Sequence, residues 1–142
     1  MFPSSKLIKI FIISLLISTF IGCDDYDNWI PNVRVDRRLD LNTELATLGL
    51  LQARMIDNEG VNGILLFRLE DRQFNAFDRT CPFQPEDNCA VDFDDAELKA
   101  VCPCCGSEFE LFYNGDILKG PARRPLKQYR TVIEGSMLRI TN

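Results

Sequence analysis

From residue 63 to the C-terminus, hydrophobic and polar residues follow one another in short runs that are typical of β-strands. Four pairs of runs occur, each separated by a few polar or turn-forming residues. The pairs are 64–69 with 74–80, 90–94 with 98–103, 109–113 with 116–120, and 129–133 with 137–141. The third pair flanks Asn114-Gly115, the strongest short-range hairpin signal. Successive hairpins without a long helical pattern predict an all-β, antiparallel domain.

Upstream of residue 63 the pattern is weaker. Residues 33–41, VRVDRRLDL, begin with alternating apolar and charged residues and predict an edge strand. Residues 43–57 have no clean period and receive no assignment. The polar, turn-rich segment 23–32 is typical of a short tether. We therefore expect the folded domain to occupy residues 33–142.

The first 22 residues have the features of a signal peptide. Two lysines, Lys6 and Lys9, precede an apolar run at 10–21, which is too short for a comfortable membrane span of about 20 residues. The run ends in Gly22-Cys23, which resembles a bacterial lipobox, so Cys23 is expected to carry a lipid. An ordinary cleaved signal and an uncleaved anchor helix are the alternatives. The resemblance implies a lipid-anchored protein of the bacterial cell envelope, facing the periplasm or the surface.

The charge of the chain argues against a nucleic-acid partner. The whole chain has 16 basic and 21 acidic residues. Removing Lys6 and Lys9 with the signal leaves 14 basic residues (16 − 2) and a net charge of −7 (14 − 21). Binding to phosphates needs clustered positive charge instead.

Five further cysteines lie within 25 residues of one another, in two loops between predicted hairpins. They are Cys81 and Cys89 in TCPFQPEDNCA, and Cys102, Cys104 and Cys105 in VCPCCGSEF. Thiolates that converge from two loops can hold a soft metal or an iron–sulfur cluster. Exported cysteines also tend to form disulfides, but five cannot all pair with one another. Both interpretations remain open from the residues alone.

Residues from about 64 to 142 resemble a Rieske-type domain. The matching segments are FNAFDRTCPF and VCPCCGSEFELFYNGDILKGPARRPLKQYRTVIEGSMLRI, the second with Gly120-Pro121-Ala122, Pro125-Leu126 and Tyr129. The resemblance implies an antiparallel sandwich of short hairpins with a subdomain that carries the cysteines in two loops. It also implies a [2Fe-2S] cluster and one-electron transfer to a redox partner.

The resemblance assigns roles to individual cysteines, but both histidine ligands of the family are replaced. Its cysteine ligands correspond to Cys81 and Cys102, and its histidine ligands to Phe83 and Cys105. Phe83 cannot bind iron, whereas Cys105 can bind it as a thiolate, which would lower the reduction potential. A disulfide between the loops would join Cys89 to Cys104.

Three hypotheses follow for the centre. In the first, Cys81, Cys102, Cys105 and Cys89 hold an altered cluster. In the second there is no cluster, and Cys89–Cys104 joins the loops. A second bridge then links Cys81 to Cys102 or Cys105, and the domain is a structural or interaction module. Zinc is the third, although seven residues between Cys81 and Cys89 is poor spacing for a knuckle. No arginine pair occurs in the signal, so the chain is expected to cross the membrane unfolded and to meet any metal outside.

A catalytic role is not expected, because the chain has no histidine and therefore no imidazole base. Ser107 is a candidate hydrogen-bond donor to a cluster sulfur, or else a turn cap. Tyr129 is ambiguous between such a role and the core. The aromatic residues expected in the core are Phe67, Phe74, Phe77, Phe109 and Phe112.

Overall fold

The structure is a computed structural model that describes residues 30–142. The predicted signal peptide (1–22) and the lipidation site Cys23 lie outside the described residues. Among the described residues, Ile30 is buried, and Lys127 Nζ donates hydrogen bonds to Pro31 O and Asn32 Oδ1. No helix within residues 30–142 is long and apolar enough to cross a membrane.

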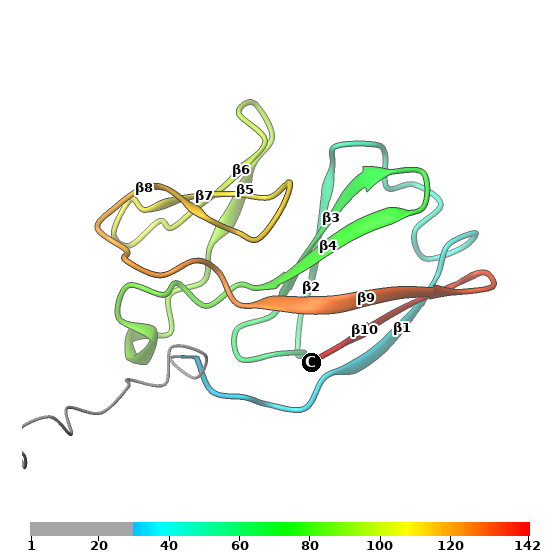
Figure 1. The fold of residues 1–142 in the computed structure, drawn as a ribbon, viewed down its shortest axis with the longest axis horizontal. Helices are drawn as coiled ribbons and strands as arrows, with labels where there is room; N and C mark the ends of the chain where they lie inside the picture. Colours follow the sequence, from blue (N-terminus) through cyan, green and yellow to red (C-terminus); the bar gives the residue numbers. More distant parts are fainter. Residues whose placement is uncertain (1–29) are drawn as a thin grey trace, which may run out of the picture.

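The described residues form two antiparallel sheets, and no α-helix occurs among them (Figure 1). The larger sheet has the strand order β1-β10-β9-β4-β3-β2, and the smaller has β5-β6-β7-β8. The strands of the larger sheet are β1 (Asp36–Asp40), β2 (Ala53–Ile56), β3 (Ile64–Glu70), β4 (Gln73–Asp78), β9 (Gln128–Glu134) and β10 (Met137–Thr141). Those of the smaller sheet are β5 (Asp92–Asp94), β6 (Lys99–Val101), β7 (Glu108–Glu110) and β8 (Ile117–Lys119).

The all-β prediction is confirmed, and so are the four hairpins: β3 pairs with β4, β5 with β6, β7 with β8, and β9 with β10. The predicted edge strand is β1, which pairs with β10. The unassigned segment supplies the other edge, β2, which pairs with β3. Figure 1 shows the smaller sheet at one end of the larger one.

Strand β3 separates two hydrophobic clusters. Ile64 and Leu66 belong to one cluster, which is formed by residues of the larger sheet and its adjoining segments. Leu65 and Phe67 belong to a second cluster, to which residues of the smaller sheet also contribute. All four side chains are fully buried. Burial on both faces explains why this strand is a continuous apolar run rather than an alternating one. The second cluster also includes Cys81, Cys89 and Cys102, so the cysteine loops are part of the core.

Of the five phenylalanines predicted in the core, four are buried, but Phe112 is exposed at 36% and the prediction was wrong for it. Phe112 lies in the turn between β7 and β8, with its ring edge-on to Phe67 at 5.4 Å. The backbone of this turn curves around the Glu110 carboxylate, which accepts hydrogen bonds from the five successive N–H groups of residues 112–116. This carboxylate therefore fixes a wider turn than Asn114-Gly115 alone predicts.

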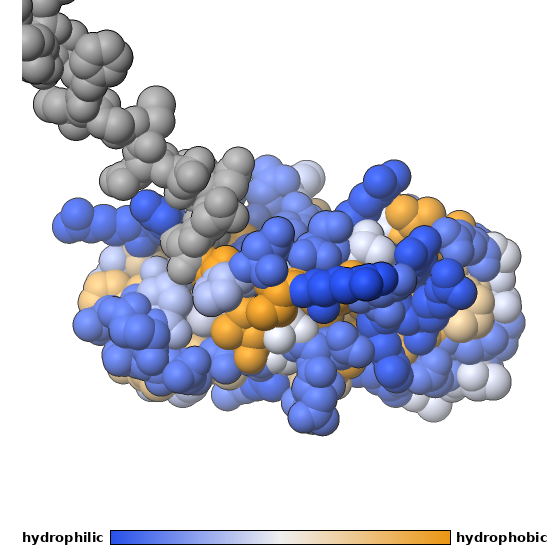
Figure 2. All heavy atoms as spheres, turned by 90° about the horizontal axis from the view of Figure 1, so that it is seen from below, coloured by the Kyte–Doolittle hydropathy of each residue, from blue (hydrophilic) through white to orange (hydrophobic). Residues whose placement is uncertain are grey.

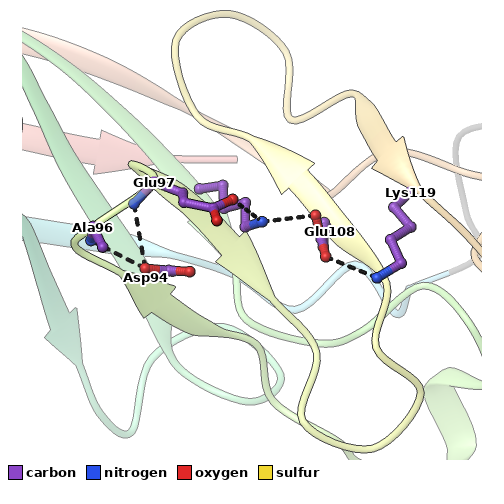
Figure 3. A network of polar contacts seen from close by, with 6 residues as sticks. Asp94, Ala96, Glu97, Glu108 and Lys119 are labelled. Carbon is purple, nitrogen blue, oxygen red and sulfur yellow. Dashed lines mark hydrogen bonds and ion pairs between the residues drawn. The ribbon is translucent and has the colours of Figure 1, made fainter.

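An ion-pair network connects the strands of the smaller sheet (Figure 3). Glu108 on β7 binds Lys99 on β6 at 2.8 Å and Lys119 on β8 at 3.1 Å, and Lys99 also contacts Glu97. Hydrogen bonds from Lys99 and then Lys119 lower the pKa of Glu108. On the face seen in Figure 2, hydrophilic residues predominate and hydrophobic residues form only small patches.

Candidate metal centre

The first cysteine loop joins β4 to β5 and is closed at its base by the backbone. Thr80 and Ala90 form an isolated β-bridge, and the Cys81 N–H donates to Cys89 O at 2.8 Å. Between them lies a 3₁₀ turn, η2 (Pro85–Asp87), flanked by Gln84 and Asn88 in the left-handed region at φ 78° and 53°. The loop thus holds its two cysteines side by side.

A buried carboxylate connects this loop to the larger sheet. Asp78 is fully buried, and its Oδ1 accepts hydrogen bonds from the Thr80 N–H at 2.8 Å and the Thr80 hydroxyl at 2.5 Å. Its Oδ2 accepts the Val61 N–H at 2.8 Å and the Tyr129 hydroxyl at 2.7 Å. Burial, and then the hydrogen bond to Asp78, raise the pKa of Tyr129. Tyr129 is therefore a core residue that braces the base of the loop.

The second cysteine loop joins β6 to β7 and turns at Gly106. The Cys102 N–H donates to Ser107 O at 2.8 Å, and the Gly106 N–H donates to Cys102 O at 2.9 Å. Gly106 adopts φ +73°, a left-handed conformation that favours glycine. This turn brings the side chains of Cys102, Cys104 and Cys105 toward the first loop.

Four of the five sulfurs fall into a disulfide and a close thiol pair. Cys89 and Cys104 form a disulfide, which confirms the bridge that the resemblance implies. Cys89 is predicted both as a metal ligand and as a disulfide partner, and in this structure its sulfur is bonded to Cys104. The Sγ atoms of Cys81 and Cys105 are 3.6 Å apart.

Cys81, Cys102 and Cys105 are free, and their Sγ atoms all lie within 4.8 Å of one another. Cys81 and Cys102 are buried at 2% and 1% exposure, whereas Cys105 is partly exposed. A cavity of about 100 Å³ adjoins them and is lined by all five cysteines together with Phe83, Gln84 and Asp87. Soft metals bind thiolates gathered in this way.

The free thiols differ in acidity. Burial, and then the hydrogen bond with Cys102, raise the pKa of Cys81. Burial alone would also raise the pKa of Cys105, but hydrogen bonds with Ser107, Cys102 and Cys81 together hold it below its ordinary value. Ser107 Oγ lies 3.1 Å from Cys105 Sγ and accepts the Ala122 N–H at 2.9 Å, which leaves the hydroxyl hydrogen free to point at the sulfur.

Sequence reasoning found all the cysteines, Ser107 and Tyr129, but it missed Asp78, Gln84 and Asp87. Asp78 lies two residues before Thr80 and three before Cys81, and this position is the one signal that could have found it. Gln84 and Asp87 line the cavity because of the backbone path around η2, which no short motif specifies.

The site is that of a small β domain with three free thiols and a disulfide held between two loops. Comparison with known proteins identifies the class. The model of the Rieske [2Fe-2S] domain family matches residues 38–130. The chain belongs to this family, whose domains are iron–sulfur electron-transfer components.

A relative in sequence is the cytochrome b6-f complex iron-sulfur subunit of Chlorobaculum thiosulfatiphilum, 42% identical over 53 residues, or 37% of this chain and 28% of that subunit. The chain thus matches less than a third of that relative's length.

Several solved structures are similar in fold. The plasma membrane Rieske protein PetC3 from Synechocystis PCC 6803 has a TM-score of 0.56 and 27% identity, over 78% of this chain and 100% of that chain. The ferredoxin of carbazole 1,9a-dioxygenase from Nocardioides aromaticivorans IC177 has a TM-score of 0.51 and 20% identity, over 76% and 94%. The second likeness concerns the fold alone.

The donor atoms fit the family's group in part. A Rieske cluster is held by two cysteines and two histidines. The resemblance assigns Cys81, Cys102 and Cys105 to three of these four positions, and Phe83, which it assigns to the fourth, has no donor atom. The site therefore fits an iron–sulfur group through three thiolates, and it does not reproduce the ligand set of the family.

Proposed function

We propose that the protein is a one-electron carrier of the cell envelope, anchored to a membrane through a lipid on Cys23, with an altered iron–sulfur centre held by cysteine sulfur. The observation that carries the proposal is the convergence of three free thiols from two loops, in a domain of the Rieske family. Cys81, Cys102 and Cys105 would hold the group. When bound, it would supply reversible one-electron transfer.

The surroundings of the thiols suit such a centre. Cys81 and Cys102 lie in the hydrophobic cluster between the sheets, which limits access of water to them. The Ser107 hydroxyl lies beside Cys105 Sγ, and hydrogen bonds to cluster sulfurs tune the reduction potential. Gln84 and Asp87 line the same cavity and offer oxygen atoms where Phe83 offers none.

A redox partner would dock beside the centre. Arg123 and Arg124, together with Pro82, Phe83 and Pro121, surround a hollow next to the thiol cavity. Guanidinium groups there would favour a partner with an acidic surface.

The test is the iron and acid-labile sulfide content of the full chain, extracted anaerobically from the envelope. We expect both elements, with visible absorption bands that bleach on reduction. Cys81→Ser, Cys102→Ser and Cys105→Ser should each lose most of the iron, whereas the matched control Ser136→Ala, in the β9–β10 turn, should retain it. A wild-type chain without iron would exclude the proposal.

Phe83→His provides a gain-of-ligand test, because it restores an imidazole at a position where the resemblance places one. Thiolate ligation should keep the midpoint potential of the wild type below the Rieske range, whose lower end is about −150 mV. Phe83→His should then raise the potential and increase the iron content. An unchanged spectrum and potential would show that residue 83 does not face the metal.

A second candidate function is a metal-free structural or interaction module. It is favoured by the Cys89–Cys104 disulfide, which leaves Cys89 without a thiol to bind a metal, and by Phe83, whose side chain has no atom that could bind one. In this case the chain isolated from the envelope lacks iron and zinc, remains folded, and is studied through the proteins that co-purify with it.

A further inference from the structure

Two of the free thiols are already in contact. Cys81 Sγ lies 3.6 Å from Cys105 Sγ, although the residues are 24 positions apart in the sequence. Each belongs to a different loop, and the Cys89–Cys104 disulfide already holds these loops together. A second bridge between them therefore needs the two sulfurs to approach from 3.6 Å to the S–S bond length of about 2.05 Å.

We propose that Cys81 and Cys105 form a dithiol–disulfide couple that exchanges two electrons with disulfide-containing proteins or small molecules. This activity goes beyond the proposed one-electron centre, because it operates in the metal-free chain and does not depend on iron. An exported chain meets oxidants before or instead of metal, and the same sulfurs serve either chemistry.

The exposure of the two residues determines which sulfur reacts first. Cys105 is partly exposed at the surface of the second loop, whereas Cys81 is 2% exposed. Ser107 adds a hydroxyl 3.1 Å from Cys105 Sγ, with its hydrogen available to that sulfur. Cys105 is therefore the attacking residue, and Cys81 is the resolving residue.

The exchange proceeds in two steps. The Cys105 thiolate attacks one sulfur of a disulfide R–S–S–R, a mixed disulfide Cys105–S–S–R forms, and the first R–S thiolate leaves. Cys81 then loses its proton, its sulfur attacks Cys105 Sγ, the Cys81–Cys105 bond forms, and the second R–S thiolate leaves. Two electrons pass to the R–S–S–R disulfide, and the two thiol protons end on two molecules of R–SH.

Cys102 is not part of this pair. It is 1% exposed, and its sulfur lies 3.7 Å from Cys89 Sγ, a disulfide sulfur. Cys102 lies beside the existing Cys89–Cys104 bridge and remains, of the five cysteines, the one free thiol after oxidation. The remaining four form two bridges.

The experiment counts thiols in the full chain, extracted from the envelope, reduced, freed of metal and treated with oxidised glutathione. Thiols are blocked with iodoacetamide under denaturing conditions. Trypsin cleavage after Arg79, Lys99 and Lys119 then gives two peptides, 80–99 and 100–119, that contain all five cysteines. The mass of these linked peptides gives the number of alkylated thiols and of bound glutathiones.

After this treatment the wild type should have one free thiol among the five cysteines, compared with three in the structure. Cys102→Ser should have none, and Cys105→Ser should keep two. Cys81→Ser should keep Cys102 free and trap one glutathione on Cys105, because the resolving thiol is missing. Cys104 and Cys105 lie in the same peptide, so its mass alone does not show which of them is bridged. The serine variants show which cysteines pair.

Three thiols in the oxidised wild type would overturn the inference. So would the opposite pattern, with none in Cys105→Ser and two in Cys102→Ser, because Cys81 would then pair with Cys102. Iron in the chain as isolated, together with three thiols in the oxidised wild type, would refute the couple and leave the electron-carrier proposal standing. Pair formation in a chain isolated without iron would support the couple and exclude that proposal.

Discussion

The buried Asp78–Tyr129 hydrogen bond gives the sharpest prediction for the stability of the site. Tyr129→Phe keeps the aromatic ring in the core and removes only the hydroxyl, which is 2.7 Å from Asp78 Oδ2. A hydrogen bond to a charged group contributes about 1.5–3 kcal/mol. We therefore expect Tyr129→Phe to lower the free energy of unfolding by about 2 kcal/mol.

Asp78→Asn should cost more. The carboxylate accepts four hydrogen bonds, two on each oxygen, whereas an asparagine has one acceptor oxygen and presents an NH₂ group to the other donors. The N–H of Val61 or of Thr80 then faces a donor, and we expect a loss of about 3–4 kcal/mol. Because both residues belong to one network, the double variant should lose less than the sum of the single losses.

The assay is urea unfolding of the reduced, metal-free chain, with Tyr113→Phe as the matched control. Tyr113 is 75% exposed, so its loss of a hydroxyl should change stability by less than about 0.5 kcal/mol. A second measurement is the alkylation rate of buried Cys81, which requires opening of the first loop. A loss of 2 kcal/mol should raise this rate by about 30-fold if the network anchors that loop.

Two results would refute this reasoning. If Tyr129→Phe is as stable as Tyr113→Phe, the hydroxyl makes no net contribution. If stability falls by about 2 kcal/mol while the alkylation of Cys81 is unchanged, the network stabilises the sheet and does not anchor the loop.

Three further predictions concern the same region. Gly60→Ala should destabilise the chain more than Gly135→Ala in urea unfolding. Both glycines have positive φ, but only at Gly60 would a Cβ lie 2.6 Å from Asp78 Oδ2 and 2.9 Å from the Tyr129 hydroxyl. Equal losses of stability would contradict this prediction. Replacing Cys89 and Cys104 together by serine should lower the free energy of unfolding by about 3 kcal/mol relative to the metal-free wild type, which is the value for a disulfide that closes a loop of about 15 residues. An unchanged free energy of unfolding would mean that the bridge does not form. Ser107→Ala should shift the alkylation of Cys105 to higher pH, because hydrogen bonds that oppose burial lower the pKa of that thiol; an unchanged pH profile would show that Ser107 does not act on it.

The strand arrangement could largely be predicted from the sequence because each hairpin is a local unit. The runs on either side of residues 70–73 and 134–136 pair across short turns. Strand β2 was not predictable in the same way. Its residues Ala53, Arg54 and Met55 are only partly buried, so an edge position leaves no clean period.

The site was predictable in its residue types and less so in its pairing. The family resemblance implied Cys89–Cys104, but no pattern showed that Cys81 would contact Cys105 rather than Cys102 alone. Such contacts depend on how two loops face each other in space. The exposure of Phe112 was also unpredictable, because its turn is set by Glu110, which accepts bonds from backbone groups of any residue type.

Fold and ligand set are physically separable in this domain. The loops are closed by backbone hydrogen bonds at Cys81 and Cys102, by the Cys89–Cys104 disulfide, and by the buried Asp78. None of these contacts involves a metal, so replacement of a ligand at position 83 or 105 leaves the scaffold intact. A match to the family over residues 38–130 therefore reports the scaffold, while the chemistry depends on three sulfur atoms and the one aromatic ring beside them. The same three thiols can bind a soft metal, or two of them can form a disulfide. Which outcome occurs depends on whether the thiols meet a metal or an oxidant first.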